Sequence, residues 1–203
     1  MQDEAIRRVL DFWFSAAELD APQIDSRMER WFGTDPALDA RMREEFGDLV
    51  GQALEGKLDH WAKSADGRLA LILLLDQLCR NIHRGTARAF AGDKRALKLC
   101  VEGSISNDYR PLSPVQQVFF FMPLQHAESL GVQDKSVRIY NALAEGVSGT
   151  LRETFLTFAQ FAELHRDIVA QFGRFPHRNR HLGRANTREE AAYLAADGMS
   201  SSQ

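Results

Sequence analysis

The sequence predicts an all-α fold of about eight helices, joined by short loops and packed as stacked antiparallel pairs. Apolar residues recur at spacings of three and four along nearly the whole chain, whereas the strictly alternating runs of β-strands are missing. Residues that favour helix starts and ends stand at the borders of these segments. We expect a single all-helical domain over residues 1–197 and a disordered tail over residues 198–203.

The N-terminal third predicts three helices. The first covers about 3–17, with apolar residues from Ile6 to Phe14 on one face. A loop at "LDAPQIDS" (19–26) precedes a short helix that ends at "WFG" (31–33). Asp35 is placed to cap a long helix that begins at Pro36, because proline is favoured in a first turn. That helix is expected to break near Gly51 or Gly56.

Two central helices are predicted over 66–84 and 113–131, with a helix over about 93–104 between them. The first is apolar on all sides for two turns, so we expect other helices to cover it. The second opens with Ser113 as N-cap and Pro114, and we expect the two to pack together. Pro123 lies inside it and predicts a kink, because proline cannot donate its backbone hydrogen bond.

Three further helices follow, over about 133–146, over 150–172, and at "TREEAAYLAA" (187–196). Gly173 is placed to end the second of these.

Composition favours a protein of the cytoplasm. The chain starts with acidic residues rather than a basic and apolar leader, and its two cysteines lie far apart. Its apolar runs are far shorter than the roughly 20 residues that span a bilayer. No membrane association and no cofactor are therefore expected.

Basic charge gathers in one stretch, "FGRFPHRNRHLGR" (172–184), which holds four arginines in a chain of net charge −3. Outside this stretch, acidic residues exceed basic ones by seven. Such a balance repels large polyanions, which makes nucleic acid an unlikely partner, while the local cluster suits a small anion.

A second polar cluster ends the first central helix in "LLLDQLCRNIHRG" (73–85). Asp76 follows a fully apolar run, and a buried carboxylate needs a partner. Arg80 lies at i+4 on the same face, with His83 and Arg84 one turn further. The cluster fits a ligand pocket and an internal salt bridge about equally.

The histidines do not form a metal motif. No two of them stand at i and i+4 with an adjacent Glu, so His83, His126 and His165 predict no metal site. Each also fits a hydrogen-bonded core histidine.

The chain resembles the bacterial DUF924 family of uncharacterised proteins in "VLDFWF" (9–14), "DQLCRNIHRGTARAFAGDKRAL" (76–97), "FFFMPLQHAES" (119–129) and the arginine-rich stretch. The resemblance implies a fold similar to tetratricopeptide-like superhelices, and it implies no reaction. The positions that match its motifs are Asp76, Gln77, Arg80, Asn81, His83, Arg84, Met122, Pro123, His126, Glu128 and Phe172 to Asn179.

The leading hypothesis is a pocket for a small phosphorylated or carboxylated ligand, because guanidinium groups bind such anions bidentately. The candidate ligand-binding residues are Arg80, Asn81, His83, Arg84, Arg174, His177, Arg178 and Asn179. Catalysis is left open, with Asp76 or His126 as a general base and Glu128 or Gln125 orienting it.

The alternatives are a scaffold that binds an acidic peptide or protein partner, RNA binding through the basic loop, and purely structural roles for the arginines.

Overall fold

The computed structural model describes residues 2–15 and 19–196, and within them every regular element is helical. The predicted end of the first helix at residue 17, and the tail, lie outside the described residues. The longer helices are α1 (Gln2–Phe14), α2 (Ala21–Phe32), α3 (Pro36–Leu54), α6 (Asp93–Ile105), α7 (Pro114–Gln125), α8 (Leu130–Glu145) and α9 (Thr150–Phe172). The short ones are η1 (Asp59–Lys63), η3 (Ala87–Phe90), η4 (Pro176–Arg178), α10 (Asn179–Leu182) and α11 (Arg188–Ala195).

One continuous central helix consists of α4 (Ala65–Ile72), a π-helical segment η2 (Leu73–Leu78) and α5 (Cys79–Ile82). When it is counted as one, the described residues contain ten α-helices, so the prediction of about eight was too low. The four-residue α10 lies in the arginine-rich stretch, for which the sequence predicted no helix.

The all-helical class is confirmed, but a tetratricopeptide-like superhelix is not. Helices α1, α3, α6 and α7 all contact the central helix, so they surround it instead of stacking in a row of pairs. The physical reason lies in the central sequence, since the side chains from Leu69 to Leu75 are at most 1% exposed and need cover on every side. The contact between the central helix and α7 confirms that the two predicted central helices are neighbours.

Several predicted helix ends are confirmed. The Asp35 side chain accepts hydrogen bonds from the first turn of α3, and Ser113 is the N-cap of α7, where its backbone N–H donates to Gln116 Oε1 over 2.9 Å. Gly173 ends α9 with a φ of 69°, in the left-handed region that glycine tolerates. Of the two predicted breaks in α3, the one near Gly51 is wrong because Gly51 is helical, and the one near Gly56 is confirmed. The helix ends at Leu54, and Gly56 follows the C-cap Glu55 with a φ of 80°.

Two predicted boundaries were wrong. Residues 21–26 are helical rather than loop, because Asp20 forms a capping box with Gln23 and Pro22 occupies the first turn of α2. The helix predicted over 113–131 ends at Gln125, and α8 begins at Leu130. Pro123 lies within α7, two residues before this end.

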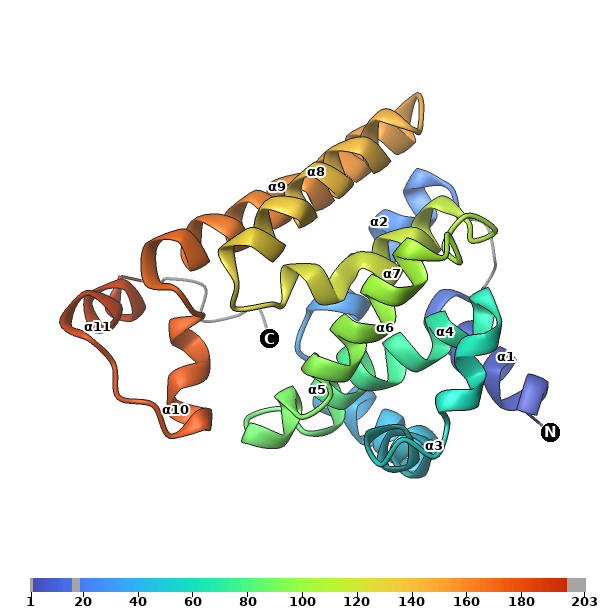
Figure 1. Ribbon diagram of the computed structural model, residues 1–203, viewed down its shortest axis with the longest axis horizontal. Coiled ribbons are helices and arrows are strands. Elements are labelled where there is room, and N and C mark those ends of the chain that lie inside the picture. The colour runs from blue at the N-terminus through green and yellow to red at the C-terminus, as the bar shows by residue number, and fades with distance from the viewer. Residues whose placement is uncertain (1, 16–18, 197–203) are drawn as a thin grey trace.

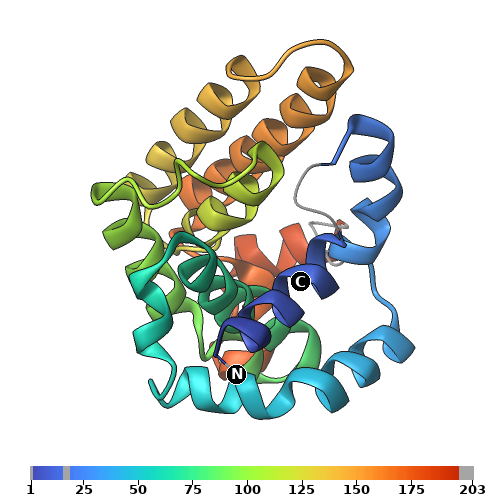
Figure 2. The same cartoon turned by 90° about the vertical axis from the view of Figure 1, so that its right-hand side faces the viewer.

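Helices α8 and α9 form a long antiparallel hairpin, and the loop between them lies at one extreme of the molecule (Figures 1 and 2). Beyond α9 the chain turns back through η4 and α10 before α11 (Figure 1). A small apolar cluster of Ile168, Val169 and Phe175, with Phe172 and Tyr193 packed against it, anchors this return. The arginine-rich stretch is thereby attached to the end of α9. Among the described helices, none is long and apolar enough to cross a bilayer.

Candidate functional site

Asp76 lies in the π-helical segment at the middle of the molecule and is fully buried. In this segment the backbone N–H of Cys79 donates to the carbonyl of Leu74, five residues earlier. Such π segments are rare and frequently occur at functional sites. The buried carboxylate and the altered helix geometry therefore coincide.

Three side chains hold this carboxylate. His126 Nδ1 lies 2.7 Å from Asp76 Oδ1, and Gln77 Nε2 donates to Oδ2 over 2.6 Å. Arg80 Nη2 lies 3.5 Å from Oδ1, which confirms the i+4 pairing predicted from the sequence. Burial alone would raise the pKa of Asp76, but the charges and hydrogen bonds of these partners outweigh it and hold the pKa well below its usual range. Asp76 is thus ionised at neutral pH.

His126 caps the C-terminus of α7, which directs its ring towards the central helix. Burial and the positive charge of Arg80 lower its pKa, although Asp76 acts in the opposite sense. A neutral imidazole carries one proton, and because an ionised carboxylate can only accept, that proton sits on Nδ1. The lone pair is then on Nε2, on the opposite side of the ring.

Arg80 and Arg178 meet at Asp93, the first residue of α6. Arg80 Nη2 lies 2.7 Å from Asp93 Oδ1, and Arg178 Nη1 lies 3.1 Å from Oδ2. The ring of Phe90 lies beside both guanidinium groups, at 5.3 and 4.9 Å from their central carbons. Asp93 is therefore the link between the central helix and the arginine-rich stretch.

Gly92 makes this meeting possible. A Cβ atom at this position would overlap the backbone carbonyl of Leu75 in the π segment. The turn before α6 thus packs directly on the π segment, which places the next residue, Asp93, within reach of Arg80.

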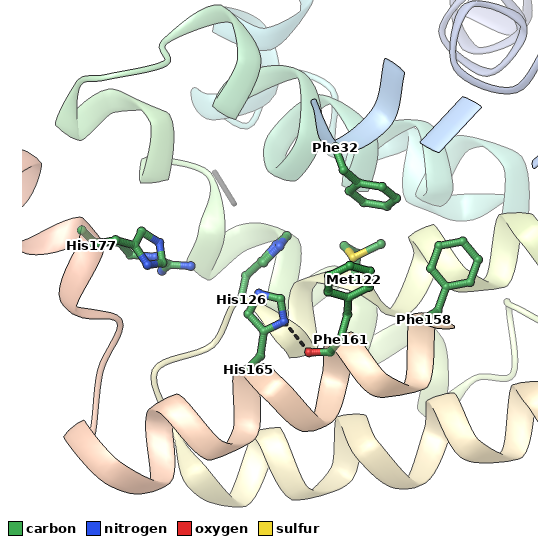
Figure 3. Close-up of a pocket in the computed structure, with 8 residues that line it drawn as sticks. Phe32, Met122, His126, Phe158, Phe161, His165 and His177 are labelled. Carbon is green, nitrogen blue, oxygen red and sulfur yellow. Dashed lines mark hydrogen bonds between the residues drawn. The ribbon is translucent and has the colours of Figure 1, made fainter. Parts of the chain in front are cut away.

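A cavity lies beside the Asp76–His126 pair. Its apolar end is formed by Phe32, Met122, Phe158 and Phe161, and its polar end by His126, His165 and His177 (Figure 3). Arg178 also lines the cavity, and its charge acts on His165 and His177. It holds about 590 Å³ of unoccupied space, including the part at its mouth that is open to solvent.

Two further histidines of the cavity are neutral. Burial, together with the neighbouring positive groups, lowers the pKa values of His165 and His177 to about 3. His165 Nδ1 lies 2.7 Å from the carbonyl oxygen of Phe161, so this nitrogen carries the proton. Nε2 of His177 is buried and has no hydrogen-bond partner among the described residues.

The structure brings Arg80, His177 and Arg178 to one end of the site and places the other predicted ligand-binding residues elsewhere. Arg174 binds both carboxylate oxygens of Glu190, at 2.6 and 2.8 Å, and Arg84 binds Asp39 at 2.7 Å. The amide of Asn179 donates to Asn186 and Glu190. His83 is partly buried at the end of the central helix, and Asn81 is buried with its Oδ1 unpartnered among the described residues. For all the predicted residues that lie elsewhere, a role in ligand binding stays a prediction.

Glu128 does not orient His126, although the sequence suggested that it could. Its carboxylate binds Arg184 at 2.6 and 2.9 Å and accepts from the backbone N–H of Phe175. Burial alone would raise the pKa of Glu128, but these hydrogen bonds and the nearby arginine charges outweigh it and lower the pKa. Glu128 therefore fixes the arginine-rich stretch, and Asp76 takes the orienting position beside His126.

Sequence reasoning missed Asp93 and the aromatic wall of the cavity. The sequence did not predict that Phe32, Phe158 and Phe161 line a cavity, because helical periodicity does not distinguish a cavity wall from a filled core. Asp93 follows Gly92 within the stretch 76–97, and the adjacent glycine was the available signal of a close backbone approach. The described part of the chain contains no group of three or more His, Cys, Asp or Glu side chains that could hold a metal ion.

Comparison with known proteins identifies the family. Residues 9–198 match the model described as "Bacterial protein of unknown function (DUF924)". The chain belongs to the DUF924 family. It is also similar to the solved structure of ATU0120, a protein of unknown function from Agrobacterium tumefaciens, with 34% identity and a TM-score of 0.81 over 97% of this chain and 99% of that one. No curated protein matches.

The family motifs predicted from the sequence meet at the cavity. Asp76 comes from the stretch 76–97, His126 from 119–129, and Arg178 from 172–184. His126, His177 and Arg178 line the cavity, and Asp76 supports His126 from the core, so three of the segments that carry the family resemblance meet at this site.

Proposed function

We propose that the cavity binds a small organic acid that has an apolar or aromatic body and one carboxylate or phosphate group. The observation that carries the proposal is the division of the cavity into an aromatic end and a polar end (Figure 3), together with Arg178 in its lining. A ligand with the same division would bury its body against the first and place its acidic group at the second.

The aromatic end favours an apolar body. Met122 and Phe158 are at most 4% exposed, while Phe161 retains 41% exposure at the mouth. A ligand body would therefore cover mainly the exposed surface of Phe161 and the partly exposed Phe32, at about 25 cal/mol for each Å² removed from water.

The polar end favours an acidic group. Arg178 is 4% exposed, and its Nε is buried without a partner among the described residues. Burial and the charge of Arg80 lower its pKa to about 10, so its guanidinium remains charged at neutral pH. The two arginines and the carboxylates of Asp76 and Asp93 balance one another, and the neutral His177, whose Nε2 has no partner among the described residues, can donate a further hydrogen bond.

The test is thermal stability at fixed ionic strength with hexanoate, 3-phenylpropanoate and phenyl phosphate, each against its uncharged alcohol. An acid at one hundred times its Kd should add about 2.7 kcal/mol to the free energy of unfolding. Arg178→Gln should abolish the shift, whereas Arg180→Gln, the same charge change at an exposed position of the same stretch, should retain it. Phe161→Trp at the mouth should block binding without touching Arg178.

If no acid stabilises the unmodified chain, the proposal fails. An acidic peptide with a C-terminal aromatic residue belongs in the same panel, because it offers a carboxylate beside an apolar ring. A shift with this peptide and with none of the small acids would favour the scaffold hypothesis instead.

A further inference from the structure

We infer that His126, held by Asp76, is a general base that activates water for the hydrolysis of a small carboxylic ester in the cavity. The inference rests on the proposed function, because the acid that such a reaction releases is the ligand class proposed above. It adds a reaction and assigns the residues that carry it.

The geometry of the pair supports this role. Asp76 Oδ1 lies 2.7 Å from His126 Nδ1, while the ring itself lines the cavity. A carboxylate that accepts from Nδ1–H fixes the tautomer in which Nε2 is the proton acceptor, and it stabilises the imidazolium once Nε2 is protonated. The His126 side chain is 12% exposed to solvent, whereas the Asp76 side chain is fully buried. Water can thus reach the base but not the carboxylate that supports it.

The surroundings of His126 keep it in its basic form at neutral pH. The groups that face it are Asp76, Arg80 and Asp93 on the side of the central helix and α6, and His165, His177 and Arg178 on the other side. The negative groups favour the imidazolium, and burial and Arg80 favour the neutral ring.

The reaction balances without any further co-reactant. His126 Nε2 takes a proton from water, and the water oxygen adds its electron pair to the ester carbonyl carbon while the C=O π electrons move to the carbonyl oxygen. Arg178, which lines the same cavity, stabilises this negative oxygen. The C=O bond re-forms, the bond to the alcohol oxygen breaks, and the imidazolium returns its proton to that oxygen. The products are one alcohol and one carboxylic acid, which ionises in water.

His165 is the second cavity histidine with which His126 can be compared as a general base. Its Nδ1 also donates, but to the backbone carbonyl of Phe161, which carries no charge to stabilise an imidazolium. Burial lowers its pKa to about 3, and no carboxylate is hydrogen-bonded to it that would stabilise its protonated form. Replacement of His126 should therefore reduce the rate far more than replacement of His165.

The experiment follows the release of 4-nitrophenolate from 4-nitrophenyl hexanoate by the full chain between pH 5 and 8.5. We expect saturable hydrolysis that hexanoate inhibits competitively, with kcat/KM rising with pH and levelling off above the pKa of His126. His126→Gln should lower kcat by about 100-fold or more with little change in KM. His165→Gln should lower it by less than about tenfold, and the exposed His60→Gln should leave the rate unchanged.

Three results would overturn the inference. The first is no hydrolysis above the buffer rate by a chain that hexanoate stabilises, in which case the proposed function stands alone. The second is hydrolysis that His126→Gln does not affect. The third is hydrolysis that persists in Phe161→Trp, a variant at the cavity mouth that keeps the Asp76–His126 pair and stays informative even if His126→Gln fails to fold. If none of the three acids stabilises the chain and the ester is not hydrolysed, both proposals fail together.

Discussion

His126 Nδ1 lies 2.7 Å from Asp76 Oδ1, although the two residues are 50 positions apart in the sequence. The contact joins the end of α7 to the π segment of the central helix. Since a buried carboxylate is stable only when it is paired and hydrogen-bonded, this contact is structural as well as chemical. The same pair that orients the imidazole also makes a charge tolerable in the core.

Replacement of Asp76 by Asn should therefore destabilise the protein. The change leaves Arg80 with a single carboxylate partner and removes the negative charge from the group that accepts from His126 Nδ1–H. We expect the free energy of unfolding in urea to fall by about 3 kcal/mol, as for other buried ion pairs that lose one member.

Asp59→Asn is the matched control. Asp59 also pairs with an arginine, Arg95, but its side chain is 61% exposed. The loss should stay below about 1 kcal/mol. Equal losses in the two variants would contradict the structural role of Asp76.

The sequence predicted those features of the fold that depend on neighbouring residues. The pairing of Asp76 with Arg80 follows from i+4 spacing, and the ends of α3 and α9 follow from Asp35 and Gly173. The contact with His126 could not be predicted, because it depends on how two helices cross. The sequence could name His126 as a candidate base but not Asp76 as its partner.

The arginine-rich stretch shows the same limit. Its composition predicted an anion site, but Arg174 and Arg184 bind Glu190 and Glu128, carboxylates that lie 16 and 56 residues away in the sequence. Arg178 lines the cavity, although it also binds Asp93. A local excess of charge does not tell which arginines find internal partners, because those partners come from other elements.

Gly92→Ala should disturb the site through the backbone. The added Cβ would overlap the Leu75 carbonyl, so the turn before α6 must move away from the π segment and carry Asp93 with it. We expect a loss of about 1 to 3 kcal/mol in urea unfolding, the usual cost of overpacking.

Gly51→Ala is the corresponding control. Gly51 lies inside α3, and a Cβ there meets no atom within 4 Å. Alanine should stabilise the helix by about 0.5 to 1 kcal/mol, because it lowers the entropy of the unfolded chain. A Gly92→Ala protein as stable as the unmodified one would refute the close approach of the turn to the π segment.

Stability should decrease as the pH falls from 6.5 to 5. His165 and His177 have pKa values of about 3 in the folded protein because burial disfavours their charged forms, whereas an unfolded histidine has a pKa of about 6.5. Below pH 6.5 the unfolded chain therefore binds protons that the folded chain does not, and the stability from these neutral rings, complete above pH 6.5, is lost as the pH falls towards 3. Each ring contributes a slope of up to about 1.4 kcal/mol per pH unit.

The measurement is urea unfolding between pH 5 and 6.5. Asp76 and Glu190, whose pKa values are lowered in the folded protein, change stability only at a lower pH, so this range isolates the histidines. His165→Gln should reduce the slope and the exposed His60→Gln should not, whereas an unchanged slope in His165→Gln would mean that His165 is already protonated in the folded state.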